Sequence, residues 1–168
     1  MKCSKCNTKN PDGSKFCSSC GESLLEKRVF EHQDLYDKVT THLEFIGYDI
    51  GKPVEGDDGK YLRVLAINKN RSNLNITFNL SGMMVFVSWY TIDKDKVDKK
   101  REEALTAINK MNLSSLVCSF SLSEKGDSIT ISSWYPGEYS KKLFSDFLET
   151  YEADIKSGFN SSGILDFS

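Results

Sequence analysis

The sequence predicts an α+β protein, in which a small cysteine-rich unit precedes one larger domain of helices and a mainly antiparallel sheet. Three observations support this prediction. Four of the 5 cysteines lie within the first 20 residues. From about residue 30, helical and alternating hydrophobic patterns follow one another, with turn signals between them. The chain has 168 residues, 39% of them hydrophobic and 27% charged, as expected for one ordinary domain with a short extension.

The cysteines form two Cys-x-x-Cys pairs with ten residues between them, at Cys3, Cys6, Cys17 and Cys20. Each such turn can direct two sulfur atoms at one point, so four thiolates can surround a metal ion in the tetrahedral geometry of zinc. Asn7 and Gly21 follow the pairs, and both tolerate the left-handed backbone that a metal-binding turn often needs. The spacing predicts one structural zinc ion. Four cysteine ligands leave no coordination position for a catalytic water.

Residues 3–21 resemble the short zinc ribbons found at the N-termini of many bacterial and archaeal proteins. Between the cysteine pairs, the run Asn10-Pro11-Asp12-Gly13 predicts a turn that folds the loop back on itself. Phe16 is the one large apolar residue of this unit. So small a unit cannot fold by apolar burial, and we expect metal binding to supply most of its folding free energy.

Three other uses of these cysteines compete with the zinc site. Disulfides are one, but no candidate signal peptide precedes Cys3, so we expect a reducing, cytoplasmic location. A redox Cys-x-x-Cys motif normally follows a βαβ pattern, which the sequence lacks. Iron in a rubredoxin-like site has the same four ligands and remains the alternative to zinc.

Charge is unevenly distributed along the chain. Residues 1–20 carry Lys2, Lys5, Lys9 and Lys15 against Asp12, a net charge of +3. Because the whole chain carries −2, the remainder carries −5. An acidic main body argues against extensive phosphate contacts there, so a role in nucleic-acid binding would fall to the ribbon. No apolar run is long enough to span a membrane.

Helical and strand patterns alternate through the main body. The first helix carries Leu35, Val39, Leu43 and Ile46 at helical spacing and is predicted to end at Gly47. His32 and His42 lie ten residues apart and not at the i, i+4 spacing of a helical metal pair, so we interpret both as surface or edge residues. Three strands are predicted next, at residues 61–68, 73–80 and 83–90. The third is apolar on both faces, which favours a central position in the sheet.

A second helix is predicted from Asp93 or Asp95 to Met111, then a hairpin over residues 116–131 that buries Cys118 as a small core residue. A last helix follows, with its apolar side running from Tyr139 to Tyr151. The predicted order is α-β-β-β-α-β-β-α, with a five-stranded sheet and helices on one face. We assign residues 1–22 to the ribbon, 23–30 to a connector, 31–156 to the α+β domain and 157–168 to a flexible tail.

Residues 30–155 resemble the YbjN family of proposed bacterial sensory transduction regulators, which shares the fold of type III secretion chaperones. The resemblance rests on the helix end at residues 108–112, the strand Phe120-Ser121-Leu122, an acidic turn with glycine and a final helix. It implies a binding protein, often a dimer, and carries no catalytic residues. Members of the family usually need no zinc ribbon, so we expect the ribbon to redirect the choice of partner here.

Two aromatic pairs, Trp89-Tyr90 and Trp134-Tyr135, each end a predicted strand just before a helix. Side by side, they could form a platform that grips an apolar peptide or stacks on bases. The alternative, which we favour, is that the tryptophans fill the corners between sheet and helices, because isolated aromatic pairs are usually buried.

The sequence contains no evident nucleophile with a partnering histidine and no phosphate-binding glycine motif, so we expect no enzymatic activity. We expect a protein-binding adaptor or chaperone-like regulator that is able to form a homodimer. In this prediction, the ribbon is a rigid docking element, and an exposed strand edge could add a strand from the client. The alternative is a nucleic-acid-associated regulator that uses the lysines of the ribbon.

Overall fold

The computed structural model describes residues 2–3, 5–11, 14, 16–21, 33–56, 61–79, 84–135 and 138–168. The chain divides into two compact units, Met1–Glu31 and His32–Ser168. The predicted connector, residues 23–30, lies outside the described residues, as do Asp12, Gly13 and Lys15 of the ribbon.

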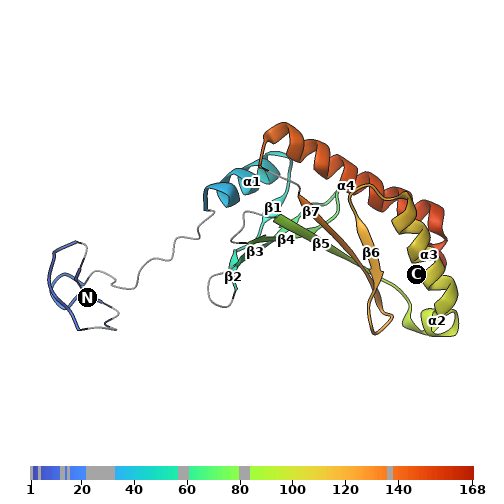
Figure 1. Cartoon of the computed structure of the whole chain (residues 1–168), viewed down its shortest axis with the longest axis horizontal. Coiled ribbons are helices and arrows are strands. Elements are labelled where there is room, and N and C mark those ends of the chain that lie inside the picture. Colours follow the sequence, from blue (N-terminus) through green and yellow to red (C-terminus); the bar gives the residue numbers. More distant parts are fainter. Residues whose placement is uncertain are drawn as a thin grey trace. The chain divides into compact units, whose positions relative to one another are not determined.

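The larger unit has the predicted α+β architecture (Figure 1). One antiparallel sheet has the strand order β1-β3-β4-β5-β7-β6, and β2 also pairs with β3. None of the described helices is long and apolar enough to cross a membrane. The elements in chain order are α1 (Gln33–Phe45), β1 (Asp49–Ile50), β2 (Val54–Glu55), β3 (Tyr61–Ile67), β4 (Leu74–Asn79), β5 (Met84–Thr91), α2 (Lys94–Lys99), α3 (Arg101–Ser114), β6 (Ser119–Leu122), β7 (Ser128–Tyr135), α4 (Lys141–Ser162) and the 3-10 helix η2 (Ile164–Phe167).

The sheet has seven strands in the described part of the chain, where five were predicted. The two additional strands, β1 and β2, have 2 residues each, too few to show an alternating pattern. The single helix predicted after Asp93 is two helices, because the backbone of Lys100 leaves helical geometry between α2 and α3. The Asp93 side chain caps α2 by accepting hydrogen bonds from the backbone N–H groups of Asp95 and Lys96.

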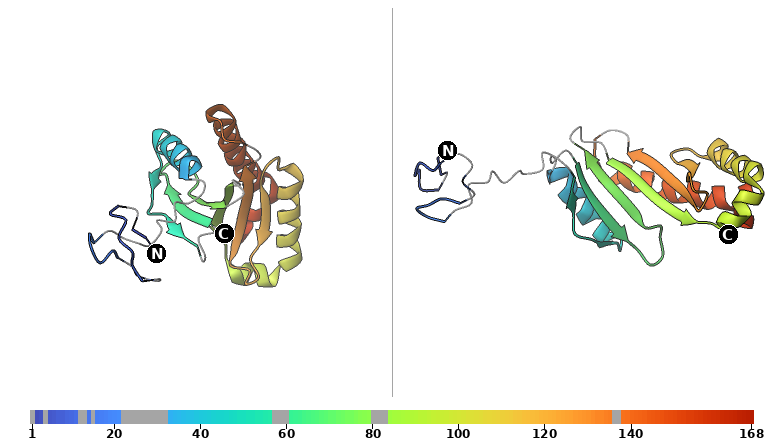
Figure 2. Two further views of the ribbon diagram at one scale, coloured as in Figure 1. Left: turned by 60° about the vertical axis from the view of Figure 1, so that its left-hand side comes forward. Right: turned by 90° about the horizontal axis from the view of Figure 1, so that it is seen from below.

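One face of the sheet is covered by α1 and α4, and the opposite face carries no helix in the described part of the domain (Figure 2). Phe86 of the central strand β5 is fully buried against three rings of α4, those of Phe144, Phe147 and Tyr151. On α1, Tyr36 packs edge-on against Phe78 of β4. The hydrophobic core of the domain therefore lies between the sheet and these two helices.

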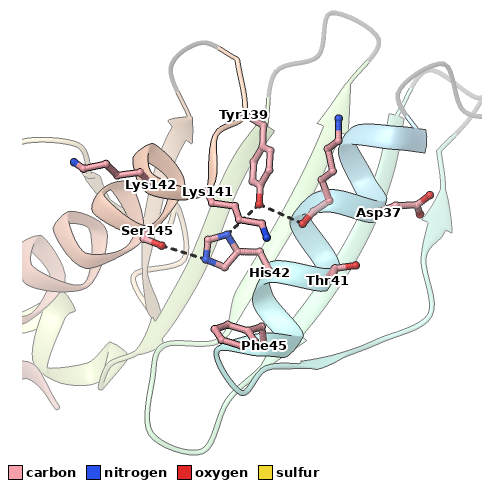
Figure 3. Close-up of a pocket in the computed structure, with 9 residues that line it drawn as sticks. Asp37, Thr41, His42, Phe45, Tyr139, Lys141, Lys142 and Ser145 are labelled. Carbon is pink, nitrogen blue, oxygen red and sulfur yellow. Dashed lines mark hydrogen bonds between the residues drawn. The ribbon is translucent and has the colours of Figure 1, made fainter.

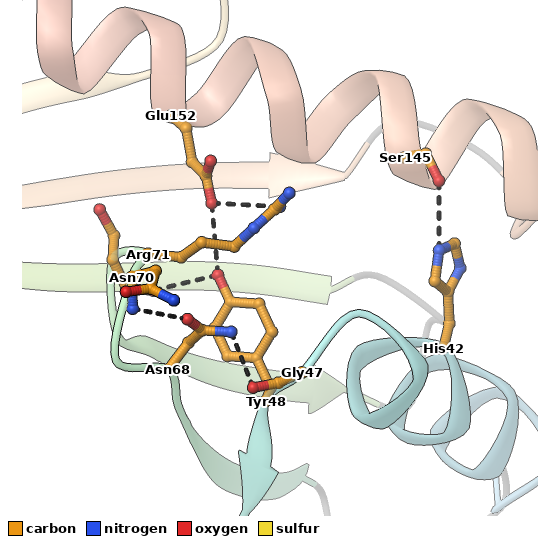
Figure 4. Close-up of polar contacts among 9 residues, drawn as sticks. His42, Gly47, Tyr48, Asn68, Asn70, Arg71, Ser145 and Glu152 are labelled. Carbon is orange, nitrogen blue, oxygen red and sulfur yellow. Dashed lines mark hydrogen bonds and ion pairs between the residues drawn. The ribbon is translucent and has the colours of Figure 1, made fainter.

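Polar contacts attach the edge of the sheet to α4 (Figure 4). The Tyr48 hydroxyl donates a hydrogen bond of 3.2 Å to the Ser72 carbonyl and lies 3.4 Å from Glu152 Oε1. Arg71 Nη1 lies 3.4 Å from the same Glu152 oxygen. These contacts hold the β3–β4 connection against α4, because one carboxylate of that helix bonds residues from two segments.

The C-terminal residues differ from the prediction of a flexible tail over 157–168. Helix α4 continues to Ser162, Gly163 ends it with a left-handed backbone (φ 83°), and η2 buries Ile164 and Phe167. The buried side of α4 continues through small or polar residues, Asp154, Gly158 and Ser162, which hide the hydrophobic period in the sequence. A Cβ atom on Gly158 would lie 3.1 Å from Met111 Cε, so glycine permits close packing of α3 on α4.

Candidate metal centre and interaction face

The four cysteines of the ribbon bring their sulfur atoms together. All four Sγ atoms lie within 4.8 Å of one another. The Sγ atoms of Cys3 and Cys20 are 3.7 Å apart, and those of Cys6 and Cys17 are 3.5 Å apart. Tetrahedral zinc with bonds of about 2.3 Å requires sulfur atoms about 3.8 Å apart. The predicted ligand set therefore has the spacing of a tetrathiolate metal site.

The backbone after each cysteine pair adopts the predicted conformation. Asn7 and Gly21 have φ values of 59° and 70°, both in the left-handed region. The N–H of Asn7 donates to the Cys3 carbonyl, and the N–H of Gly21 donates to the Cys17 carbonyl, each at 2.9 Å. The two halves of the site thus use the same turn, and each turn directs two sulfur atoms inward.

Asn10 links the two halves of the ribbon, a role that its sequence context did not reveal. Its buried side chain accepts hydrogen bonds from the backbone N–H and the hydroxyl of Ser18, at 2.9 and 3.0 Å. Its Nδ2 group donates to the Thr8 carbonyl at 3.0 Å and to Cys17 Sγ at 3.5 Å. The sequence identified Asn10 only as a turn residue, because its contact partners lie on the far side of the loop.

Hydrogen bonds within the ribbon favour the thiolate form of two of its cysteines, Cys17 and Cys6. Backbone N–H groups of Cys20 and Ser19 lower the pKa of the Cys17 thiol to about 6. The hydroxyl and backbone of Thr8 lower the pKa of Cys6. The metal-binding form of cysteine is the thiolate, so these hydrogen bonds prepare the site for an ion. Phe16 is 63% exposed and contributes little to a core. We therefore still expect metal binding to supply most of the folding free energy of the ribbon.

The helix-free face of the sheet, called the open face below, carries both tryptophans. Trp89 is 58% exposed and Trp134 is 62% exposed, so the prediction that they fill buried corners is wrong. The aromatic pairs divide between the two faces, since Tyr135 is buried on the helix side and Tyr90 packs on Phe159 of α4 with ring centroids 4.5 Å apart. Successive strand residues point to opposite faces, which explains the division.

The two tryptophans share one face but are not adjacent. Trp134 lies opposite Val85, whereas Trp89 lies opposite Thr130 on the same pair of strands. The two positions are therefore four residues apart along β5, about 13 Å at the rise of a strand. The described surface between and beside them includes Val85, Val87 and the exposed Leu65. One flat group cannot stack on both rings, but an extended or helical segment can span them.

The β6 edge of the sheet is closed by side chains. The Asn112 side chain bonds both backbone groups of Phe120, accepting from its N–H at 2.8 Å and donating to its carbonyl at 2.9 Å. Just before β6, Asp154 Oδ2 accepts from the N–H groups of Leu116, Val117 and Cys118 at 2.7–3.0 Å. A client strand therefore cannot pair at Phe120 without displacing Asn112.

Comparison with known proteins supports both the zinc ribbon and the fold of the α+β domain. Residues 2–24 match the family of zinc-ribbon domains. The N-terminal unit is a zinc ribbon, and its four cysteines are placed to hold one structural zinc ion. No curated protein matches the chain in sequence.

The α+β domain has the fold of YbjN. A crystal structure of YbjN from E. coli, described as a proposed transcription regulator, is similar over 73% of this chain and 87% of its own. The TM-score is 0.51 and the sequence identity is 13%. At this identity the similarity shows the fold alone, and the predicted YbjN-like architecture is confirmed.

Cys118 and His42, also considered from the sequence, are not part of the open face. Cys118 is buried, and burial together with Asp154 raises the pKa of its thiol to about 12, so it is not an activated nucleophile. His42, on α1, is half-buried beside Tyr139 and Ser145. Its ring nitrogens lie 3.0 Å from the Tyr139 hydroxyl and 3.1 Å from the Ser145 hydroxyl. His32 lies outside the described residues.

Proposed function

We propose that this protein is a non-enzymatic adaptor or chaperone-like regulator, which binds a protein client on the open face and uses the zinc ribbon as a rigid docking element. The observation that carries the proposal is the pair of exposed tryptophans on the helix-free side of the sheet. Exposed tryptophans in an apolar surrounding are typical anchors of protein interfaces.

The charge of the open face favours a protein client over a nucleic acid. Among all residues of β3, β4, β5 and β7, only Arg63 is charged. Interface centres are depleted in charge and enriched in aromatic residues, whereas phosphate binding requires clustered lysine or arginine. A client with apolar side chains spaced to reach Trp89 and Trp134 matches the composition of this surface.

Three features support binding without catalysis. The ribbon cysteines are metal ligands with no open coordination position. The Cys118 thiol is buried and protonated at neutral pH. Both ring nitrogens of His42 are engaged by hydroxyl groups, and no carboxylate in the described part of the chain bonds to its ring. We place the protein in a reducing compartment such as the cytoplasm, where the thiolates remain available for zinc.

The test is affinity purification of the full chain followed by titration with the purified client. We expect Trp89→Ser with Trp134→Ser to abolish binding of the client. Leu113→Ser, which changes a still more exposed apolar residue at the end of α3, should leave binding unchanged. A partner set that the tryptophan variant does not alter would contradict the proposal. If the sole partner is a second copy of the chain, sedimentation shows a homodimer that the same variant dissociates.

A second candidate function is nucleic-acid binding through the ribbon. It is favoured by the exposed Lys2, Lys5 and Lys9, and by the similarity of the larger domain to YbjN, a proposed transcription regulator. Binding of this kind would fall steeply with salt and would be lost when these lysines are replaced by glutamate. Absence of binding to DNA and RNA at low salt would remove this candidate.

A further inference from the structure

A cavity of about 660 Å³ lies between α1 and the first turns of α4, away from the open face (Figure 3). This volume is within the usual range of sites for small molecules. Helix α1 forms one wall, and Tyr139 with the start of α4 forms the other. The described residues that line it are Asp37, Lys38, Thr41, His42, Phe45, Tyr139, Lys141, Lys142 and Ser145.

A linear chain of hydrogen bonds, centred on His42, forms the floor of the cavity. The Tyr139 hydroxyl donates to the Lys38 carbonyl at 3.4 Å, so it can accept from Nδ1 of His42. The Nε2 atom then accepts from the Ser145 hydroxyl at 3.1 Å. Burial, and secondarily the charge of Lys141, lower the pKa of His42 and keep the ring neutral near pH 7. The floor is therefore uncharged, and its polar atoms are already paired.

The rim of the cavity is positively charged on an otherwise acidic domain. Three lysines, Lys38, Lys141 and Lys142, line the cavity together with one acidic residue, Asp37. Lys38 and Lys142 form exposed ion pairs within their own helices, with Asp34 and Asp146. No described residue forms an ion pair or hydrogen bond with the Lys141 ammonium, which lies beside His42 in Figure 3. Exposed ion pairs of this kind contribute little stability, so Lys38 and Lys142 can readily leave their carboxylate partners to pair with an anionic ligand.

The walls supply apolar contact. Phe45, the last residue of α1, is 88% exposed although its ring lines the cavity. The methylene chains of the lysines and the edge of the Tyr139 ring add further apolar surface. A ligand would thus meet an aromatic ring and aliphatic stems inside, and ammonium groups at the rim.

We propose that this cavity binds a small anionic amphiphile, a molecule with an apolar body and a single carboxylate or phosphate group. The apolar body contacts Phe45 and the lysine stems, and the anionic group pairs with Lys141 and its neighbours. Inorganic phosphate lacks the apolar body, and a neutral alcohol lacks the charge, so neither satisfies both parts of the cavity. This site is independent of the client surface, because it lies on the helix side of the sheet.

The experiment compares four probes on the full zinc-loaded chain: decanoate, decyl phosphate, decanol and inorganic phosphate, each below its self-association concentration. The readout is the nuclear magnetic resonance signal of the His42 ring, which lies in the cavity floor. We expect saturable shifts with decanoate and decyl phosphate, and none with decanol or inorganic phosphate. The two anionic probes distinguish a carboxylate from a phosphate head group by their relative affinity.

Two variants test the assignment of the rim. Lys141→Glu should weaken decanoate binding roughly tenfold, because it replaces an attraction with a repulsion. Lys110→Glu, the same change on an exposed residue of α3, should alter it less than roughly twofold. The Trp89→Ser, Trp134→Ser variant should bind decanoate as the wild type does, even where it loses the client.

Equal weakening by both lysine variants would overturn the proposal, as would equal binding of decanol and decanoate. A His42 signal that responds to the client but to none of the probes would overturn it too, because the cavity would then be part of the client surface.

Discussion

The zinc ribbon and the α+β domain differ in what holds them together. In the ribbon, four cysteines and two left-handed residues define the structure, and among its described residues the buried hydrophobic ones are Cys3 and Cys17. In the α+β domain, stability comes from many apolar side chains of distant segments, such as Phe86 against α4. Removing one zinc ligand should therefore unfold the whole ribbon. In the α+β domain, each core substitution should instead lower the free energy of unfolding by a limited amount.

The largest effect is expected when one zinc ligand is removed. Cys17→Ser should abolish zinc binding and unfold the ribbon, because bound zinc contributes on the order of 10 kcal/mol to folding of such units. Elemental analysis should find no zinc, while the far-ultraviolet circular dichroism of the α+β domain is retained. Cys118→Ala is the control and should keep one zinc per chain. A ribbon that stays folded without metal would contradict the claim that the ribbon, unlike the α+β domain, depends on a bound ion for its folding.

In the α+β domain, Phe86→Ala should cost about 3–5 kcal/mol, since it leaves a cavity at the centre of the core. Urea unfolding of the full chain measures the loss. Zinc content should not change, because the ribbon is a separate compact unit. If Phe86→Ala released zinc, the two units would not be stabilised independently.

Asp154→Asn should cost about 2 kcal/mol at neutral pH, because the carboxylate accepts hydrogen bonds from Ser115 and three backbone N–H groups. Burial alone would raise the pKa of Asp154, but these hydrogen bonds lower it overall. The stabilisation is therefore complete above the ordinary carboxyl pKa and is lost as the pH falls through the lowered folded value.

The difference in unfolding free energy between wild type and Asp154→Asn should accordingly shrink below about pH 4. Asp146→Asn is the matched control on the exposed side of α4 and should change stability by less than about 0.5 kcal/mol. A difference that grew toward acid pH would show that the buried carboxyl is protonated in the folded chain.

The smallest effect is expected for Gly158→Ala. The new methyl group would lie 3.1 Å from Met111 Cε and 3.4 Å from Met111 Cβ, which costs more than the gain in helix propensity. We expect a net loss of about 1 kcal/mol by urea unfolding. Ser157→Ala, on the exposed neighbouring position, should be neutral or slightly stabilising. A stabilised Gly158→Ala would mean that α3 and α4 are less closely packed than described.

The ribbon was predictable from the sequence because its determinants are local. Cysteine spacing, Asn7 and Gly21 act within a few residues of one another, and the structure confirms each of them. The Asn10 side chain was missed because it bonds Ser18 across the loop. In the larger unit, alternation correctly predicted β3, β4 and β5, including the central place of β5.

Alternation could not decide which face of the sheet the helices cover. Trp89 follows Val85 and Val87 on a strand that is apolar on both sides, so its exposure depends on where α1 and α4 pack. The contact of His42 with Ser145 joins residues 103 positions apart, and no local pattern predicts it. The extension of α4 was hidden because Gly158 and Ser162 are buried without being large or apolar.

The most direct test of the open face uses the 2 tryptophans of the chain as its reporters, since both lie on that face. Acrylamide quenching of tryptophan fluorescence measures their accessibility in the free protein and after the client is added. We expect strong quenching in the free protein, close to that of the unfolded chain, and protection with a blue-shifted emission when the client binds. Tryptophans that are already protected in the free monomer, or that stay fully quenchable in the complex, would contradict a client surface on the open face.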